Sequence, residues 1–253
     1  MAEVTLLSVL QGIAEFLPIS SSGHLVLGKH LLGLQEVGLR LDVFLHVGTL
    51  FAVFAFYFSV IRRIVIGREW GYVLKLALSA VPVGVVGILL KKQFPEALRV
   101  LESPAPVGVS LIFTGFILTA TRFLPRGRLD VSFGRAFWMG IAQAIAILPG
   151  VSRSGMTIAT ARIARVETEK CAEFSFLMSA PPIAGAALLE ILEGLGNAPA
   201  ANEVSWGLTI YGCVLSAVVG YFALKFLLKS LKSRWFWLFG PYCVLAGLVV
   251  LLA

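Results

Sequence analysis

The stretch that decides the fold is Gln11-Gly-Ile-Ala-Glu15-Phe-Leu-Pro-Ile-Ser20-Ser-Ser-Gly-His24, because much of it recurs 132 residues later. The second copy reads Gln143-Ala-Ile-Ala-Ile-Leu-Pro-Gly-Val-Ser152-Arg-Ser-Gly155. The copies differ in their charged side chains: the first carries Glu15 and His24, and the second carries Arg153. A duplicated, serine-rich helix break in a very apolar chain predicts a polar site at the centre of a membrane protein.

The composition indicates an integral membrane protein. The chain has 253 residues, of which 58% are hydrophobic and 14% charged, and its mean hydropathy is +0.91. A soluble domain needs far more charge to cover its surface, whereas about 20 apolar residues span a bilayer as a helix. No cleavable signal peptide is expected, because Met1-Ala-Glu3 lacks a basic region. We expect six crossings, near residues 41–61, 70–90, 105–122, 172–192, 206–229 and 236–253.

The net charge of +7 is interpreted as a topology signal, and no nucleic-acid partner is expected. Six crossings place most Lys and Arg residues on one side, including those at 62–68, 122–135 and 162–170. The positive-inside rule makes this side cytoplasmic and puts both termini outside. The three cysteines, Cys171, Cys213 and Cys243, lack metal-ligand spacing.

The pattern predicts an all-α polytopic protein with one membrane domain, 1–253, made of an inverted repeat. Repeat one covers about 1–123 and repeat two about 133–253. Each half consists of a re-entrant helix-loop-helix followed by three transmembrane helices. The first hairpin is expected as helices 3–15 and 22–32 around a break at 16–21, and the second at 135–165. Neither helix of a hairpin can span the bilayer alone, so the two tips should meet near the midplane.

The breaks predict an anion site. Pro18 and Pro149 cannot continue the preceding helices, and serines then start the next ones as N-caps. Two helix N-termini would direct unsatisfied N–H groups at one point, which favours phosphate. Arg153 adds a permanently charged fork of donors that matches phosphate oxygens. Because a charge in mid-membrane is costly, Arg153 should have an anionic partner or ligand.

The first break carries the candidate reactive groups. Glu15 lies one turn after Gln11 and can act as a metal ligand, a general base or the countercharge of Arg153. His24 could move a proton near neutral pH, and Ser21 or an activated water is the candidate nucleophile. Ser20 and Ser22 are interpreted mainly as capping residues.

Two further polar pairs are predicted to be structural. Asp42 and His46 are expected to form a hydrogen-bond pair at a helix end and to take no part in catalysis. Glu173 and Ser175 are expected to stabilise the start of a crossing.

The same residues carry a family resemblance. The segment 11–24 together with Pro149-Gly-Val-Ser-Arg153-Ser-Gly-Met-Thr157 closely resembles the bacitracin-resistance type of undecaprenyl-diphosphate phosphatase. The resemblance spans nearly the whole chain, including Asp42-Val-Phe-Leu-His-Val-Gly-Thr49 and Glu173-Phe-Ser-Phe-Leu177. It implies an enzyme of the bacterial cell membrane that hydrolyses undecaprenyl diphosphate to the monophosphate and inorganic phosphate, which recycles the lipid carrier for cell-wall synthesis.

The resemblance also implies site roles and a divalent metal ion, Mg²⁺ or Ca²⁺. Glu15 would act in metal binding or acid–base chemistry, Ser21 and His24 as nucleophile and proton partner, and Arg153 as the diphosphate clamp. Supporting substrate contacts would come from the hydroxyls of Ser20, Ser22, Ser152, Ser154 and Thr157. Many members have glutamate where this chain has Gln11. An amide can ligate a metal through its carbonyl oxygen, but it brings no charge, so metal binding by Glu15 and Gln11 should rely on the substrate's own diphosphate.

The alternative function is a lipid-carrier flippase, or an inverted-repeat transporter of a phosphorylated ligand, because broken helices at the midplane are a recurring transporter design. Ser21 close to His24 favours chemistry, since a carrier needs anion donors but no nucleophile. The expected partners are the polyprenyl diphosphate and the bilayer, and a homodimer is left open.

Overall fold

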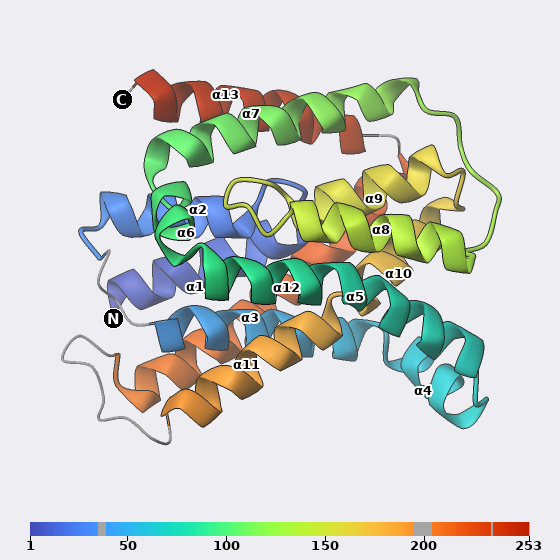
Figure 1. Cartoon of the computed structure of the whole chain (residues 1–253), viewed down its shortest axis with the longest axis horizontal. Helices are drawn as coiled ribbons and strands as arrows, with labels where there is room; N and C mark the ends of the chain where they lie inside the picture. Colours follow the sequence, from blue (N-terminus) through green and yellow to red (C-terminus); the bar gives the residue numbers. More distant parts are fainter. Residues whose placement is uncertain (35–38, 195–203, 234, 253) are drawn as a thin grey trace.

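The computed structural model describes residues 1–34, 39–194, 204–233 and 235–252, and the regular elements in these ranges are helices (Figure 1). The expected all-α class is confirmed. In chain order the elements are α1 (Ala2–Phe16), α2 (Ser21–Leu31), α3 (Leu39–Phe56), α4 (Phe58–Ile66), α5 (Trp70–Gln93), α6 (Pro95–Leu101), α7 (Pro104–Ala120), η1 (Thr121–Phe123), α8 (Phe133–Ile145), α9 (Arg153–Ile163), α10 (Thr168–Leu177), α11 (Ala180–Gly194), α12 (Trp206–Lys232), η2 (Phe236–Leu238) and α13 (Phe239–Leu252).

Both expected helix–break–helix units are present. The first break follows α1 because Pro18 restricts Leu17 to an extended conformation, with φ −67° and ψ 143°. Ser20 then caps α2, and its Oγ accepts a hydrogen bond from the Gly23 amide at 3.3 Å. In the second unit the Ser152 Oγ accepts from the Gly155 amide at 3.1 Å and starts α9. Each break therefore ends on a serine-capped helix.

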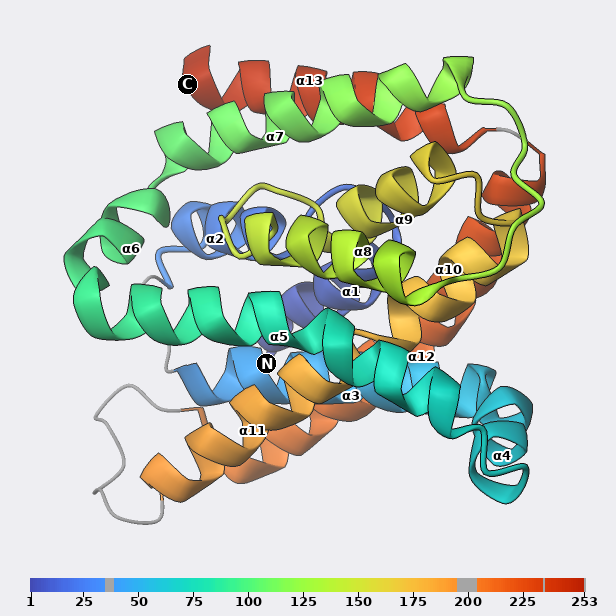
Figure 2. The same ribbon diagram turned by 45° about the vertical axis from the view of Figure 1, so that its right-hand side comes forward.

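The tips of the two hairpins touch at the centre of the molecule (Figure 2). A Cβ atom added to Gly23 would lie 2.8 Å from the Gly150 Cα, so the two backbones are in direct contact there. Gly150 has a φ of +91°, a conformation that glycine adopts without strain. The Ser154 hydroxyl on α9 donates to the Leu17 carbonyl at 3.3 Å. The two copies of the repeated motif, which are offset by 132 residues in the sequence, thus meet in one place.

Within the described ranges, four helices around the hairpins are long and apolar enough to cross a bilayer: Trp70–Gln93, Pro104–Phe123, Thr168–Leu189 and Trp206–Lys232. A fifth span is obtained if the helices on either side of Tyr57, α3 and α4, count as one, although the chain bends by 71° between them. The expected crossing at 41–61 therefore differs from the structure, since α3 ends at Phe56 and α4 turns away. The sixth expected crossing corresponds to the shorter apolar segment Phe236–Leu252, and its last expected residue, Ala253, lies outside the described part.

The surface of the helices that surround the hairpins is apolar, as a lipid-facing surface requires. Large hydrophobic side chains are exposed along α5, α7, α12 and α13, among them Leu74, Phe116, Phe222 and Leu245. Such continuous apolar exposure is rare on soluble monomers. The chain is a multi-pass membrane protein, and the number and direction of its crossings remain predictions.

Glycines set the closest helix contacts. On α7, Gly108 and Gly115 lie against the backbone carbonyls of Gly247 and Gly240 on α13. Elsewhere α1 packs on α12, and α8 packs on α5. Small residues allow such close backbone approach inside a membrane, where packing replaces the hydrophobic effect as the force between helices.

We predict that Gly48→Ala destabilises the protein by about 1–3 kcal/mol, the usual cost of overpacking. A Cβ atom at Gly48 on α3 would lie 2.1 Å from the Cys213 carbonyl oxygen on α12, and a backbone atom cannot move aside as a side-chain tip can. The measurement is the thermal unfolding midpoint of the purified protein in detergent. Gly84→Ala is the control, because that helical position has open space around it. Equal midpoints for the two variants would contradict the close α3–α12 contact.

Candidate active site

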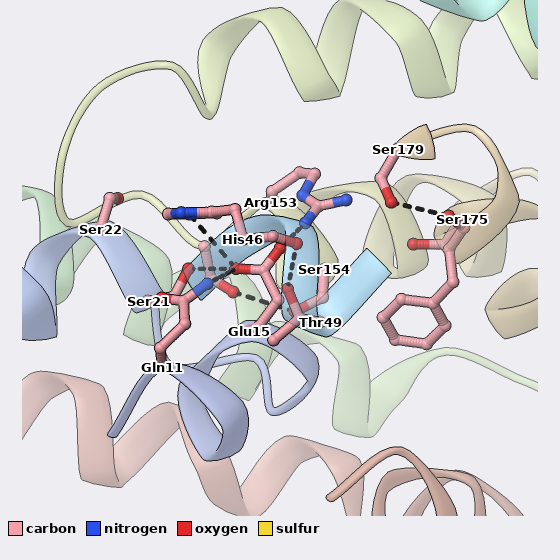
Figure 3. Close-up of polar contacts among 12 residues, drawn as sticks. Gln11, Glu15, Ser21, Ser22, His46, Thr49, Arg153, Ser154, Ser175 and Ser179 are labelled. Carbon is pink, nitrogen blue, oxygen red and sulfur yellow. Dashed lines mark hydrogen bonds and ion pairs between the residues drawn. The ribbon is translucent and has the colours of Figure 1, made fainter. Parts of the chain in front are cut away.

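Glu15, on the last turn of α1, is the residue around which the polar centre is built (Figure 3). It is 5% exposed. Its Oε2 atom accepts a hydrogen bond from the Ser21 hydroxyl at 2.6 Å and another from the Gln11 side-chain amide at 3.0 Å. Gln11 reaches it because residues four apart share one helix face, and Ser21 reaches it because the chain reverses at the break. Three predicted site residues therefore meet within the first hairpin.

Arg153 comes to Glu15 from the other hairpin. It is the first residue of α9, and its guanidinium forms an ion pair with Oε1 of Glu15 (Figure 3). Only 3% of the Glu15 side chain and 20% of the Arg153 side chain are exposed. Separating two charges buried this deeply would leave each uncompensated, which is strongly destabilising. The structure thus joins the carboxylate, the hydroxyl and the guanidinium in one site.

His46 on α3 also faces this site, in a position that sequence reasoning missed. Its Nδ1 atom lies 2.8 Å from the Asp42 backbone oxygen, so this nitrogen carries a proton. Its Nε2 atom is directed at the Glu15 Oε2 at 3.7 Å (Figure 3). The expected Asp42–His46 hydrogen bond exists, but through the Asp42 backbone, while the Asp42 carboxylate pairs with Lys29. The four-residue spacing of Asp42 and His46 predicted the hydrogen bond between these two residues. It did not predict that His46 approaches Glu15, which lies on another helix.

His24 is turned away from Ser21. Its Nδ1 atom lies 2.9 Å from the Ser20 carbonyl oxygen, and its Nε2 atom lies 2.8 Å from the Tyr242 hydroxyl on α13. The His24 and Tyr242 rings also stack, with centroids 5.8 Å apart. Both ring nitrogens are thus engaged, and the described contacts do not join His24 to Ser21 in this conformation. The expected proton-partner role therefore needs a change of rotamer.

The other predicted hydroxyls support the two helix starts. Ser22 and Ser154 each lie 3.4 Å, oxygen to oxygen, from the capping serine of their own helix. Thr157 donates to the Arg153 carbonyl at 2.8 Å, and its hydroxyl lies 2.6 Å from that of Ser175 on α10. Ser175 therefore contacts the N-terminal half of α9, close to the site. It was expected to stabilise the start of a crossing, but it lies near the C-terminal end of α10.

Glu173 lies elsewhere, at the end of the bundle near α4. Its carboxylate accepts a hydrogen bond from Tyr72 at 3.1 Å and lies 3.7 Å from the Arg63 guanidinium. This arrangement is structural, but it does not stabilise a helix start as expected, because α10 already begins at Thr168.

The donors at the centre fit a hard divalent cation in part. Gln11 is fully buried, and its Oε1 atom has no hydrogen-bond partner among the described residues. Glu15 and this free amide oxygen are the kind of oxygen ligands that Mg²⁺ and Ca²⁺ prefer. The described residues include no group of three or more His, Cys, Asp or Glu that could hold a metal, so most ligands would have to be substrate oxygens and water.

The centre therefore brings a hydroxyl, a carboxylate and a guanidinium into contact, a combination that can supply a nucleophile, a proton acceptor and a positive charge for a phosphate. The Ser21 hydroxyl already donates to a carboxylate, which is the arrangement that removes its proton as it attacks. Arg153 supplies the positive charge, and the capped N-termini of α2 and α9 add partial positive charge.

Comparisons with known proteins identify the family of the chain. Residues 4–249 match the family model described as "Bacitracin resistance protein BacA". A protein of Desulforapulum autotrophicum named undecaprenyl-diphosphatase is 37% identical, with 98% of this chain and 96% of the relative covered. Proteins with the same name from Halothermothrix orenii and Rhodopirellula baltica are 36% and 38% identical over 99% and 100% of this chain, and 96% and 97% of their own lengths are covered. With its paired hairpins and near-complete coverage, the chain belongs to the BacA family of bacitracin resistance proteins.

Proposed function

We infer that this protein is a membrane phosphatase that hydrolyses undecaprenyl diphosphate to undecaprenyl phosphate and inorganic phosphate. The observation that carries the inference is the contact of Glu15 with both Ser21 and Arg153 at the meeting point of the hairpins. The relatives are named for this activity. The alternative function, a flippase or transporter, is not favoured, because a carrier needs no hydroxyl held against a buried carboxylate.

The proposed architecture is the inverted repeat with six crossings. It is supported by the glycine contacts between α7 and α13, in which Gly108 lies against Gly247 and Gly115 against Gly240. The 132-residue offset of the serine-rich motif also relates Gly108 to Gly240 and Gly115 to Gly247. The repeat therefore maps the Gly108–Gly247 contact onto the Gly115–Gly240 contact, as a two-fold axis between the halves requires. The α1–α12 and α8–α5 contacts are related in the same general way.

The mechanism begins with the diphosphate at the centre and the prenyl tail in the bilayer. The terminal phosphate takes hydrogen bonds from Arg153 and so draws the guanidinium away from Glu15. Glu15 then accepts a proton from Ser21, or from a water in its place, as the oxygen attacks the terminal phosphorus. The bond from this phosphorus to the bridging oxygen breaks, and undecaprenyl phosphate leaves. Attack by water gives inorganic phosphate directly. Attack by Ser21 leaves a phosphoserine, and once Glu15 has given its proton to the leaving group it accepts a proton from the water that hydrolyses this ester to inorganic phosphate and free Ser21. Arg153 and the helix N-termini stabilise the charge on the equatorial oxygens.

A divalent ion, Mg²⁺ or Ca²⁺, is proposed as the cofactor, with Glu15 and the Oε1 atom of Gln11 as its ligands from this chain. When bound, the ion would neutralise diphosphate charge. One carboxylate and one amide oxygen leave most of the coordination to the substrate, which is usual for Mg²⁺ at phosphates. The proposed location is the bacterial cell membrane with both termini outside, on the basis of the distribution of basic loops.

Glu15→Gln should lower phosphate release by about 10²–10⁴-fold, the usual contribution of general acid–base catalysis. The amide keeps the shape of the side chain but neither accepts the Ser21 proton nor pairs with Arg153. Gln11→Ala should cost less, because Gln11 contributes one neutral hydrogen bond to Glu15 and one uncharged metal ligand, whereas Glu15 carries the charge and accepts the proton. The assay follows phosphate release from a prenyl diphosphate in detergent with metal present. A larger loss in Gln11→Ala than in Glu15→Gln would reverse these two roles.

Arg153→Ala should reduce kcat/KM by roughly 10²–10³-fold, as removal of one transition-state donor does in other enzymes. Arg153→Lys should recover only part of the loss, because an ammonium keeps the charge but lacks the fork that binds two oxygens. Steady-state kinetics on the same substrate measure both variants. Near-normal turnover in Arg153→Ala would remove this residue from phosphate binding.

Ser21→Ala separates attack by serine from attack by water. If Ser21 is the nucleophile, the variant should lose more than about a thousandfold in kcat, whereas water attack predicts a modest loss. Ser22→Ala is the matched control, since the neighbouring hydroxyl lies against Ser20 and not against Glu15. The comparison is made by single-turnover phosphate release. Equal losses of kcat in the two variants would show that the contact of Ser21 with Glu15 has no role in catalysis.

A further inference from the structure

A second polar cavity lies away from the centre, at the end of the bundle where η1 and the loop after it meet α9, α10, α12 and η2. Its volume is about 240 Å³. Three arginines line it from separate segments: Arg122 from η1, Arg126 from the following loop and Arg162 from the last turn of α9. Arg162 lies nine positions after Arg153 on α9, which corresponds to roughly 13 Å along the helix. The cavity is therefore distinct from the candidate active site.

Aromatic rings and a backbone carbonyl hold these arginines. The Arg122 guanidinium stacks over the Trp237 ring at 4.7 Å, and the Arg162 guanidinium lies over Phe236 at 5.8 Å. Arg126 donates to the Lys232 carbonyl at 2.9 Å. Among the described residues, Arg122 and Arg126 make no ion pair with a carboxylate. A stacked guanidinium keeps its N–H donors in its own plane, where an oxyanion can accept them.

Two acidic side chains beside the cavity are each paired with a lysine. Glu167 and Glu169 line the adjoining depression, but Lys170 lies 3.3 Å from the Glu167 carboxylate and Lys232 lies 2.8 Å from that of Glu169. The arginine-lined cavity therefore keeps an excess of positive charge.

The backbone fixes one wall of this cavity. The loop after η1 runs beside the α9–α10 turn, where the Arg128 and Leu129 amides both donate to the Arg165 carbonyl at 3.0 Å. Gly127 is required there, because an added Cβ atom would lie 2.3 Å from the Arg165 carbonyl carbon. Further along the loop, a 2.5 Å hydrogen bond from Lys170 holds the pKa of the exposed Asp130 carboxyl below its usual value. The wall is thus in place before any ligand arrives, which reduces the entropic cost of binding.

We propose that this cavity binds a phosphate group, either on the headgroup of an anionic phospholipid or as free inorganic phosphate. Guanidinium forks match phosphate oxygens in shape and charge, and Thr168 is also among the residues that line the cavity. About 30 Å³ is the share of one water, so the volume accommodates a phosphate group with some of its waters. The cavity also lies on the side that the basic loops predict to be cytoplasmic, where anionic headgroups attract Lys and Arg.

The test uses the full-length protein in neutral detergent and follows its thermal unfolding midpoint. One arm adds dioleoyl-phosphatidylglycerol, with dioleoyl-phosphatidylcholine as the neutral lipid. The other arm adds inorganic phosphate, with sodium chloride at equal ionic strength. The variants are Arg126→Gln and Arg122→Gln/Arg126→Gln. Arg128→Gln removes one charge from an exposed side chain of the same loop, and it is the charge-matched control for Arg126→Gln. The central site is intact in every protein, so differences between them report the second cavity.

Phosphatidylglycerol should raise the midpoint more than phosphatidylcholine does. The double variant should need at least about tenfold more anion for the same rise, because it loses two charge-assisted contacts, and Arg128→Gln should behave like the unmodified protein. A response to phosphatidylglycerol without one to phosphate assigns the site to a lipid headgroup, and a response to both assigns it to the phosphate group itself. If the double variant does not fold, Arg126→Gln alone carries the test. An unchanged anion response in the variant, an equal loss in Arg128→Gln, or no response to either anion would overturn the proposal.

Discussion

The ion pair of Glu15 with Arg153 is the interaction on which the rest of the structure depends. Each charge alone would be very costly inside a lipid bilayer, and the two residues come from hairpins on different halves of the chain. The hairpins must therefore meet tip to tip for either charge to be tolerated. The Gly23–Gly150 contact and the Ser154–Leu17 hydrogen bond bring the backbones close enough for this. The helices that surround the hairpins keep lipid away from the pair.

The two copies of the duplicated motif differ at their charged positions, and this difference allows them to form one site together. If both copies kept the same charged residue, two like charges would face each other at the tips, which is unfavourable in a low dielectric. The first copy instead has Glu15 where the second has Ile147, and the second has Arg153 where the first has Ser21. Gln143 shows the consequence, because its amide has no carboxylate one turn away. Gln143 is 3% exposed, and neither amide atom has a partner among the described residues.

The features that could be predicted from the sequence are those that neighbouring residues determine. Pro18 stops a helix and Ser20 caps the next one, so both breaks could be located without coordinates. The meeting of Arg153 with Glu15 was also predictable, because an unpaired charge at that depth needs a partner. The approach of His46 to Glu15 was not predictable, since it depends on how α3 packs beside α1. The bond from His24 to Tyr242 joins residues 218 positions apart, and the 71° bend at Tyr57 has no proline or glycine to signal it.

The exposures of the paired residues suggest the order in which a diphosphate would engage the site. The Arg153 side chain is 20% exposed and that of Glu15 only 3%, so an incoming anion reaches the guanidinium before the carboxylate. A guanidinium has five N–H donors, and one carboxylate cannot accept all of them. Phosphate oxygens can therefore bind Arg153 while Glu15 is still paired, and no step leaves a bare charge in the membrane. As the guanidinium turns toward the phosphate, Glu15 keeps its hydrogen bond from Ser21 and loses its ion pair, which leaves the carboxylate able to accept the Ser21 proton. Substrate binding would in this way activate the hydroxyl that the resting ion pair holds in place.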